Sequence, residues 1–347
     1  MGVRAVPMTR RAAALVVSVA CVIACLSYAP MIGAGLTYED ANVLTRLEKP
    51  FEVPSRWLTY ATFRWTTVDP DWARAVTLGV HLVNGLLVYG LLRLAWGHRP
   101  ALAAAVVFLW HPLATEAVLM FNGRADVLLT TGWLLAALGA WRGAWWLAAV
   151  GLLWASVSKE IGIAGVGIVA VIALMRLAWW RVAIGGAIGA ALAYVWLWPT
   201  VSWWMEKAPQ VDRWVFAWLQ LKAVSQLALL LVWPVGLSID HDPLVVPDAL
   251  ALLIWVGLVA VGCGAIWRGR VAVLAVTWIA CAIAPRFFVF GVETISEHQI
   301  YPALVGGVVL LVWGVIRLGD VLAAWWACAQ YRPWAGWTPM EEDRCEA

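Results

Sequence analysis

The residues of this sequence that could do chemistry lie in short polar connectors between long apolar segments. The first connector carries the adjacent acids Glu39 and Asp40. Neighbouring carboxylates can supply a general base, and their hard oxygens can also bind a divalent cation. From position alone, a solvated pair of loop acids is slightly favoured, so these uses remain alternatives at this stage.

The second connector is denser in ionisable groups. It reads HPLATEAV from His111 and then NGRAD up to Asp126, and it also contains Glu116 and Arg124. One interpretation is an Arg124–Asp126 ion pair that fixes the helix ends. The other is that its four ionisable side chains, set within 16 residues between two apolar segments, have a function.

The third connector is the short SKE motif at residues 158–160. The ammonium of Lys159 suits a phosphate ligand as a point charge. The alternative is that Lys159 and Glu160 extend to the membrane interface as a solvated pair. Two later polar motifs are DHD at 240–242 and EHQIYP from Glu297.

The composition indicates which elements must position these groups. Of 347 residues, 63% are hydrophobic and 13% are charged, whereas soluble domains are roughly half apolar. The net charge of +3 and the dispersed arginines exclude a nucleic-acid surface. The six cysteines form no CxxC pair and no metal-binding spacing with histidine, so we interpret them as packing residues.

Apolar segments of about 20 residues can cross a hydrocarbon core of about 30 Å as helices. We expect an all-α polytopic membrane bundle. Its apolar segments lie near 12–32, 73–95, 100–120, 126–141, 144–157, 161–175, 182–199, 214–236, 248–267, 271–290 and 299–318. Two of these, 126–141 and 144–157, are short for a full crossing, which favours helix ends that line a water-filled cavity.

The basic connectors predict the orientation, because cytoplasmic loops are enriched in arginine and lysine. Their arginines are Arg4, Arg10, Arg11, Arg93, Arg99, Arg142, Arg176, Arg181, Arg268 and Arg270. All are cytoplasmic together if segment 214–236 is re-entrant or lies on the outer face, which gives about ten spans. The alternative is an eleventh span that reverses the segments after it. In the first arrangement most of the acids are extracytoplasmic.

We predict one membrane-embedded domain over residues 1–330, with a first outer loop at 36–72 and a flexible cytoplasmic tail at 331–347. The apolar run at 12–32 favours a retained first helix over a cleaved signal peptide. The predicted location is the bacterial inner membrane.

The order of these motifs resembles a known family. An acidic first loop, HPxxTEAV, GRAD, SKE and a late EHxxYP are similar to the multi-pass class C (GT-C) glycosyltransferases. The similarity is closest to the transmembrane and tetratricopeptide-repeat protein O-mannosyltransferases, without their repeats. It covers most of 33–318, and residues 111–126 are its most specific part. The HLVN stretch from His81 also fits, although His81 and Asn84 by themselves favour helix-packing hydrogen bonds.

The resemblance implies a GT-C-like bundle that transfers a monosaccharide, with mannose a candidate, from a polyprenyl-phosphate donor. The acceptor is a hydroxyl of a protein, glycan or lipid on the extracytoplasmic face, and the anomeric carbon is inverted. It implies that Asp40 or Glu39 is the catalytic acid. The sequence departs from the family at Glu39, where two aspartates are common, and at His298, where relatives favour arginine in ERYLY.

We therefore expect Asp40 to take the acceptor proton, with Glu39 orienting it. Arg124 and Lys159 would stabilise the phosphate, with Arg56 and Arg286 in reserve. The residues expected to orient these groups are His111, Glu116, Asp126, Glu160, Glu297, His298 and Tyr301. If a divalent cation is a cofactor, its candidate ligands are Glu39, Asp40, Glu116 and His111.

A non-enzymatic membrane protein is the rival hypothesis, either a transporter or flippase for lipid-linked glycans or an assembly subunit. Such a transporter is expected to carry charges near the membrane midplane and often shows repeated halves. In this sequence the charges gather toward one predicted face and no repeat is evident, so an enzyme is favoured.

Overall fold

The computed structural model describes residues 9–36, 40, 43–44, 54–66, 69–176, 202, 212–238, 241, 245–287 and 296–331. Within these ranges all regular structure is helical. The main helices are α1 (Arg10–Ile32), α3 (Trp57–Thr66), α4 (Pro70–Trp96), α5 (His98–Trp110), α6 (Thr115–Leu119), α7 (Arg124–Arg142), α8 (Trp145–Ser156), α9 (Gly165–Met175), α11 (Arg213–Val232), α12 (Asp248–Arg268), α13 (Arg270–Ile283) and α14 (Tyr301–Tyr331). The predicted helical class is confirmed.

Among the described residues, five helices could cross a membrane by length and composition, or six if α5 and the residues up to Leu119, bent by 55°, form one span. The five are Arg11–Ile32, Pro70–Trp96, Arg213–Val232, Arg270–Phe287 and Glu297–Trp326. This supports a helical membrane protein. The predicted total of about ten spans stays a prediction, and segment 182–199 lies outside the described residues. Most of segment 214–236 forms α11, which is long enough to span a membrane. Its re-entrant or outer-face course stays a prediction.

The predicted segment 100–120 differs from the structure, because α5 ends at Trp110 and the chain turns at His111. Pro112 cannot donate an N–H to a continuing helix, and it instead begins the short 3-10 helix Pro112–Ala114. The ring of His111 accepts a hydrogen bond from the N–H of Leu113 in this turn. The last predicted segment, 299–318, is shorter than the helix in the structure, because α14 continues well past residue 318 to Tyr331.

Helices α7 and α8 form the most closely packed pair, and small residues explain why. A Cβ atom added at Gly132 would lie 2.6 Å from the Ala155 nitrogen, and one added at Gly151 would lie 2.4 Å from the Ala136 nitrogen. Backbones can approach so closely only where side chains are missing. Most of α7 is buried as a result, and it forms the centre of the bundle.

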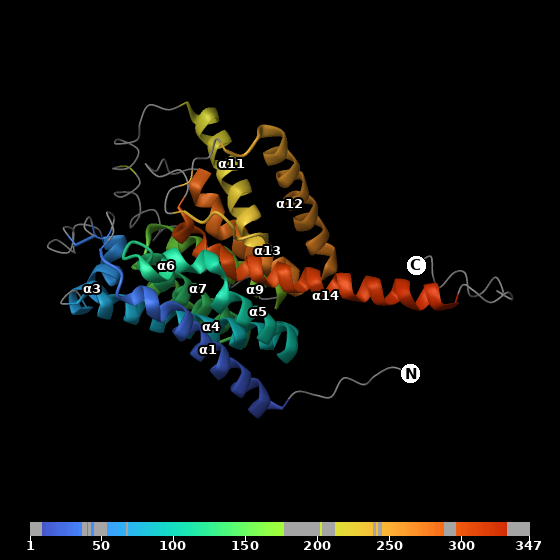
Figure 1. The fold of residues 1–347 in the computed structure, drawn as a ribbon, viewed down its shortest axis with the longest axis horizontal. Helices are drawn as coiled ribbons and strands as arrows, with labels where there is room; N and C mark the ends of the chain where they lie inside the picture. Colours follow the sequence, from blue (N-terminus) through green and yellow to red (C-terminus); the bar gives the residue numbers. More distant parts are fainter. Residues whose placement is uncertain are drawn as a thin grey trace.

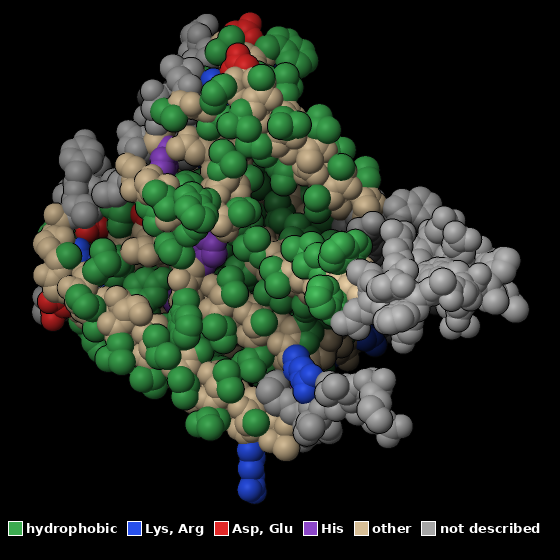
Figure 2. All heavy atoms as spheres, turned by 45° about the vertical axis from the view of Figure 1, so that its right-hand side comes forward, with side chains coloured by type: hydrophobic (Ala, Val, Ile, Leu, Met, Phe, Trp, Pro, Cys, Tyr) green, Lys and Arg blue, Asp and Glu red, His purple; other side chains and the backbone are tan. Residues whose placement is uncertain are grey.

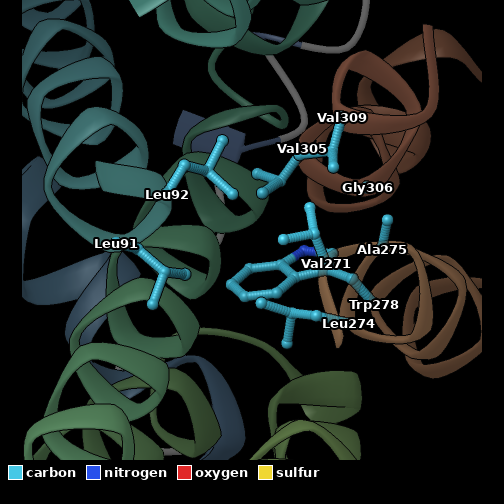
Figure 3. A pocket seen from close by; sticks show the side chains of 9 residues that line it. All are labelled: Leu91, Leu92, Val271, Leu274, Ala275, Trp278, Val305, Gly306 and Val309. Carbon is cyan, nitrogen blue, oxygen red and sulfur yellow. The ribbon is translucent and has the colours of Figure 1, made fainter. Parts of the chain in front are cut away.

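Helix α7 packs against α4, α8, α9 and α14, while α1 lies along α4 and α5 (Figure 1). Helices α11 and α12 rise from this bundle, and α14 extends beyond it (Figure 1). The molecular surface in Figure 2 is mostly hydrophobic, which fits a lipid-facing exterior. A small pocket between α4, α13 and α14 is lined by apolar side chains around Trp278 (Figure 3), so it offers no polar chemistry.

Candidate functional site

The centre of the candidate site is the tight turn Met120–Gly123, which joins α6 to α7. Gly123 packs directly on α6, because an added Cβ would lie 2.4 Å from the Cα of Ala117. This contact folds the second sequence motif back on itself. Phe121 and Asn122 in the turn therefore face groups from distant parts of the chain, as does Arg124 immediately after it.

Asp40 is fully buried against this turn, with 0% of its surface exposed. The backbone N–H of Phe121 donates to Asp40 Oδ1 at 2.9 Å. The guanidinium of Arg74, on α4, forms an ion pair with Asp40 Oδ2 at 3.3 Å. The structure thus joins the first predicted motif to the second. Its neighbour Glu39 lies outside the described residues.

Arg74 is a member of this site that sequence reasoning missed. Its guanidinium also donates to the carbonyls of Leu119 at 3.0 Å, Ile32 at 3.0 Å and Gly35 at 2.9 Å, and to that of Ala34. The available signal was an arginine inside the apolar segment 73–95. Burying a charge in a membrane costs free energy, so such a residue is a functional candidate.

Arg124 is buried close to Arg74, but it does not pair with Asp126 as one interpretation predicted. It donates to the hydroxyls of Thr77 at 2.9 Å and Thr66 at 3.0 Å, and to the carbonyl of Ala73. Its Cζ lies 3.8 Å from the centre of the Phe63 ring. Within the described ranges no carboxylate forms an ion pair with it. A desolvated cation of this kind favours an anionic ligand.

Asp126 instead pairs with Lys159 from the third motif. Lys159 Nζ lies 2.8 Å from Oδ1 and 2.7 Å from Oδ2, and Asp126 is fully buried. The alternative that Lys159 extends to the interface as a solvated residue is wrong, because its side chain is only 11% exposed and pairs with Asp126. The physical reason is that burying Asp126 at the start of α7 without a counter-charge would cost much free energy, and Lys159 supplies that counter-charge.

Glu160 pairs with Arg56, Nε to Oε1 at 2.7 Å, where the short 3-10 helices Pro54–Arg56 and Glu160–Ala164 meet. Burial raises the pKa of Glu160, but the charge and hydrogen bond of Arg56 outweigh it and hold that pKa below its ordinary value. Arg56, expected as a reserve phosphate ligand, thus already has an anionic partner. The other reserve, Arg286, donates to Gln220 of α11 at 3.4 Å.

The late motif also reaches the second motif. His298 Nδ1 lies 2.7 Å from Glu116 Oε1, and the backbone N–H of His298 donates to Glu116 Oε2 at 2.9 Å. On its other side, His298 Nε2 lies 3.5 Å from the amide nitrogen of Asn122. Glu297 accepts from His241 at 2.7 Å, which connects the DHD motif to the same group of residues.

Two predicted site residues have other partners. His111 Nε2 lies 2.9 Å from the carbonyl of Leu231, and its Nδ1 accepts from the N–H of Leu113. The hydroxyl of Tyr301 lies 2.7 Å from His81 Nδ1 and accepts from Asn84 at 3.2 Å. The expectation that His81 and Asn84 form helix-packing hydrogen bonds is confirmed, and Tyr301 belongs to their network.

The proposed metal site is not assembled in the described part of the chain. Across those residues, no three His, Cys, Asp or Glu side chains are grouped as a cation would require. The carboxylate of Asp40 is paired with Arg74, and that of Glu116 contacts Ser296 and His298. Glu39, the remaining candidate carboxylate, is outside the described residues. Among the described residues, the site thus consists of paired ionic groups together with Arg124, which has no carboxylate partner there.

Comparison of the chain with protein families, curated proteins and solved structures finds no match.

Proposed function

We propose that this protein is a membrane glycosyltransferase that moves a monosaccharide from a polyprenyl-phosphate donor to an acceptor hydroxyl. One observation carries the proposal. Polar motifs far apart in the sequence meet at the turn Met120–Gly123 and the start of α7: Asp40 and His298 contact the turn, and Lys159 contacts Asp126 two residues after Arg124. A general base beside a phosphate-binding cation is what such a transfer requires.

In the proposed reaction the acceptor O–H loses its proton to the Asp40 carboxylate. The acceptor oxygen forms a bond to the anomeric carbon, and the bond from that carbon to the phosphate oxygen breaks. The electron pair leaves with the polyprenyl phosphate. Glu39 orients Asp40, and a base in this position typically contributes about 10² to 10⁴-fold to the rate.

Arg124 is the best phosphate ligand of the predicted set. Among the described residues it is the buried cation of this site whose charge no carboxylate balances, whereas Lys159 is held by Asp126 and Arg56 by Glu160. A desolvated guanidinium stabilises developing negative charge more strongly than one in water. Lys159 then contributes by fixing the start of α7, next to Arg124.

The proposed setting is a GT-C-like bundle of about ten spans in the bacterial inner membrane. Its site faces the extracytoplasmic side, and the acceptor is a protein, glycan or lipid hydroxyl. The basic connectors support this orientation, since they follow the positive-inside rule. The resemblance to protein O-mannosyltransferases makes mannose the first sugar to test.

The test is sugar transfer by the purified protein, using a panel of polyprenyl-phosphate monosaccharides and hydroxyl acceptors. Release of polyprenyl phosphate and labelling of the acceptor are both measured. Asp40→Asn should abolish both while leaving the protein folded. Asp320→Asn is the matched control, because Asp320 is 64% exposed on α14 and pairs only weakly with Arg317 at 3.8 Å.

Two results would count against the proposal. Near-normal transfer by Asp40→Asn would remove Asp40 from the role of base. Absence of transfer with every donor, together with movement of a lipid-linked sugar across proteoliposome membranes, would favour the rival transporter or flippase.

A further inference from the structure

Arg74 occupies a place that the proposed reaction leaves unexplained. It lies near the start of α4, is 3% exposed, and its guanidinium contacts groups from several separate segments. An arginine has five N–H donors in a planar fork. Here those donors reach the end of α1, the end of α6 and the carboxylate of Asp40 at once.

The contacts with α1 concern the place where the first loop begins. Arg74 donates to the carbonyl of Ile32, the last residue of α1, and to those of Ala34 and Gly35 just after it. The last carbonyls of a helix have no partner within the helix, and a cation near them is favourable. Arg74 therefore fixes the point from which the chain runs to Asp40.

The contact with α6 fixes the opposite side of the same carboxylate. Arg74 Nε donates to the carbonyl of Leu119, two residues before Phe121, whose N–H donates to Asp40 Oδ1 at 2.9 Å. The Cζ of Arg74 also lies 5.8 Å from the centre of the Phe121 ring. One side chain thus sets both the loop that carries Asp40 and the turn that receives it.

We propose that Arg74 is the positioning residue of the transfer reaction, holding Asp40 at the turn Met120–Gly123 through its ion pair and its carbonyl contacts. This inference rests on the proposed function. Arg74 does not contact substrate in this role. Its planar fork, and not its charge alone, performs it, because a lysine ammonium is a point charge and cannot reach all of these acceptors together.

The proposal predicts a specific kinetic pattern for Arg74→Lys. The substitution keeps a cation beside Asp40 but releases the loop and the turn, so kcat should fall by about 10²-fold, as expected for a misplaced reacting group. The KM for the polyprenyl-phosphate sugar should stay within about twofold, because a positioning loss acts on the transition state and not on ground-state binding. Arg93→Lys is the control on the same helix.

A second measurement separates positioning from a general loss of folding. Thermal unfolding in detergent is compared for Arg74→Gln, Asp40→Asn and the variant with both changes. Because removing one partner leaves the other buried without its counter-charge, the double variant should be more stable than Arg74→Gln alone.

The outcomes are distinguishable from a failure of the proposed function. If the wild type transfers sugar and Arg74→Lys keeps the wild-type kcat, or raises KM with kcat unchanged, the positioning role is wrong while the function stands. If no donor is used, the function fails, and the unfolding cycle still tests the coupling. A double variant no more stable than Arg74→Gln would overturn the coupling of Arg74 to Asp40.

Discussion

The two ends of helix α7 differ in whether their charged side chains are buried or exposed. At its start, Arg124 and Asp126 are buried and their charged groups contact residues from α3, α4 and the third motif. At its end, Arg142 is exposed, and within the described ranges it forms no ion pair. A solvated arginine costs little, whereas a buried charge must be compensated. The start of α7 therefore depends on compensated buried charge, whereas its end does not.

The largest expected effect is on the buried pair at the start of α7. Lys159→Met leaves the fully buried Asp126 without its counter-charge and should destabilise the protein by about 3–5 kcal/mol. Denaturation in detergent micelles measures this loss. Lys159→Met combined with Asp126→Leu should recover most of the stability. A single variant as stable as the wild type would mean that the two ends of α7 do not differ in this way.

Next is Arg124→Gln, which removes the buried cation that we assign to the phosphate. The KM for the polyprenyl-phosphate sugar should rise or kcat should fall, and kcat/KM should drop by roughly 10²-fold or more because a charge-stabilising donor is lost. Steady-state kinetics with varied donor and fixed acceptor measures it. Lys159→Met combined with Asp126→Leu, the variant expected to keep most of its stability, serves as comparison: a larger effect on donor use there than at Arg124 would move the phosphate site to Lys159.

A smaller effect is expected at the Arg56–Glu160 pair, whose side chains are 20% and 18% exposed. The depressed pKa of Glu160 means that this pair stabilises the fold above the ordinary pKa of 4.5, and that the stabilisation is lost as pH falls below it. Arg56→Gln should therefore lower the free energy of unfolding near neutral pH by about 1 kcal/mol, and Tm with it. The difference from wild type should shrink toward pH 4.

The control for this pH dependence is Arg64→Gln, because Arg64 is exposed on α3. Its Tm difference from wild type should be small at every pH. A loss at Arg56→Gln that stays constant down to acidic pH would show that Glu160 does not supply the stabilising charge.

The smallest effect is predicted at the far end of α7. Arg142→Gln should change stability by less than about 0.5 kcal/mol and leave transfer activity unchanged, since the side chain is exposed. Cysteine labelling at the same position tests its side of the membrane: Arg142→Cys should react with an impermeant reagent only from the cytoplasm. Labelling from outside would reverse the predicted orientation and place Asp40 and Arg74 on the cytoplasmic side.

Much of the helical layout could be predicted from the sequence, and particular helices show why. The segment predicted at 126–141 is α7, and that at 144–157 is α8, with ends that differ by a few residues. Long apolar runs bounded by arginine and glycine leave few alternatives to a helix. The turn at His111 was missed, because an apolar run of spanning length conceals a break at a single proline.

The partners of the site residues could be predicted less well from the sequence than the helices. Arg124 and Asp126 are neighbours in the chain, yet their side chains project to different sides of α7 and find different partners. Arg74 was overlooked because its significance depends on carbonyl groups at the ends of other helices, and a carbonyl leaves no mark in a sequence.

The sequence by itself determined that this chain forms apolar helices and that its ionisable residues gather in a few connectors, because composition and periodicity act locally along the chain. Only the tertiary structure decided which charge meets which. Asp40 is 34 positions from Arg74, and Asp126 is 33 positions from Lys159. Such partners are selected by the close approach of packed backbones, at residues such as Gly123, and by the cost of burying any charge that has no partner.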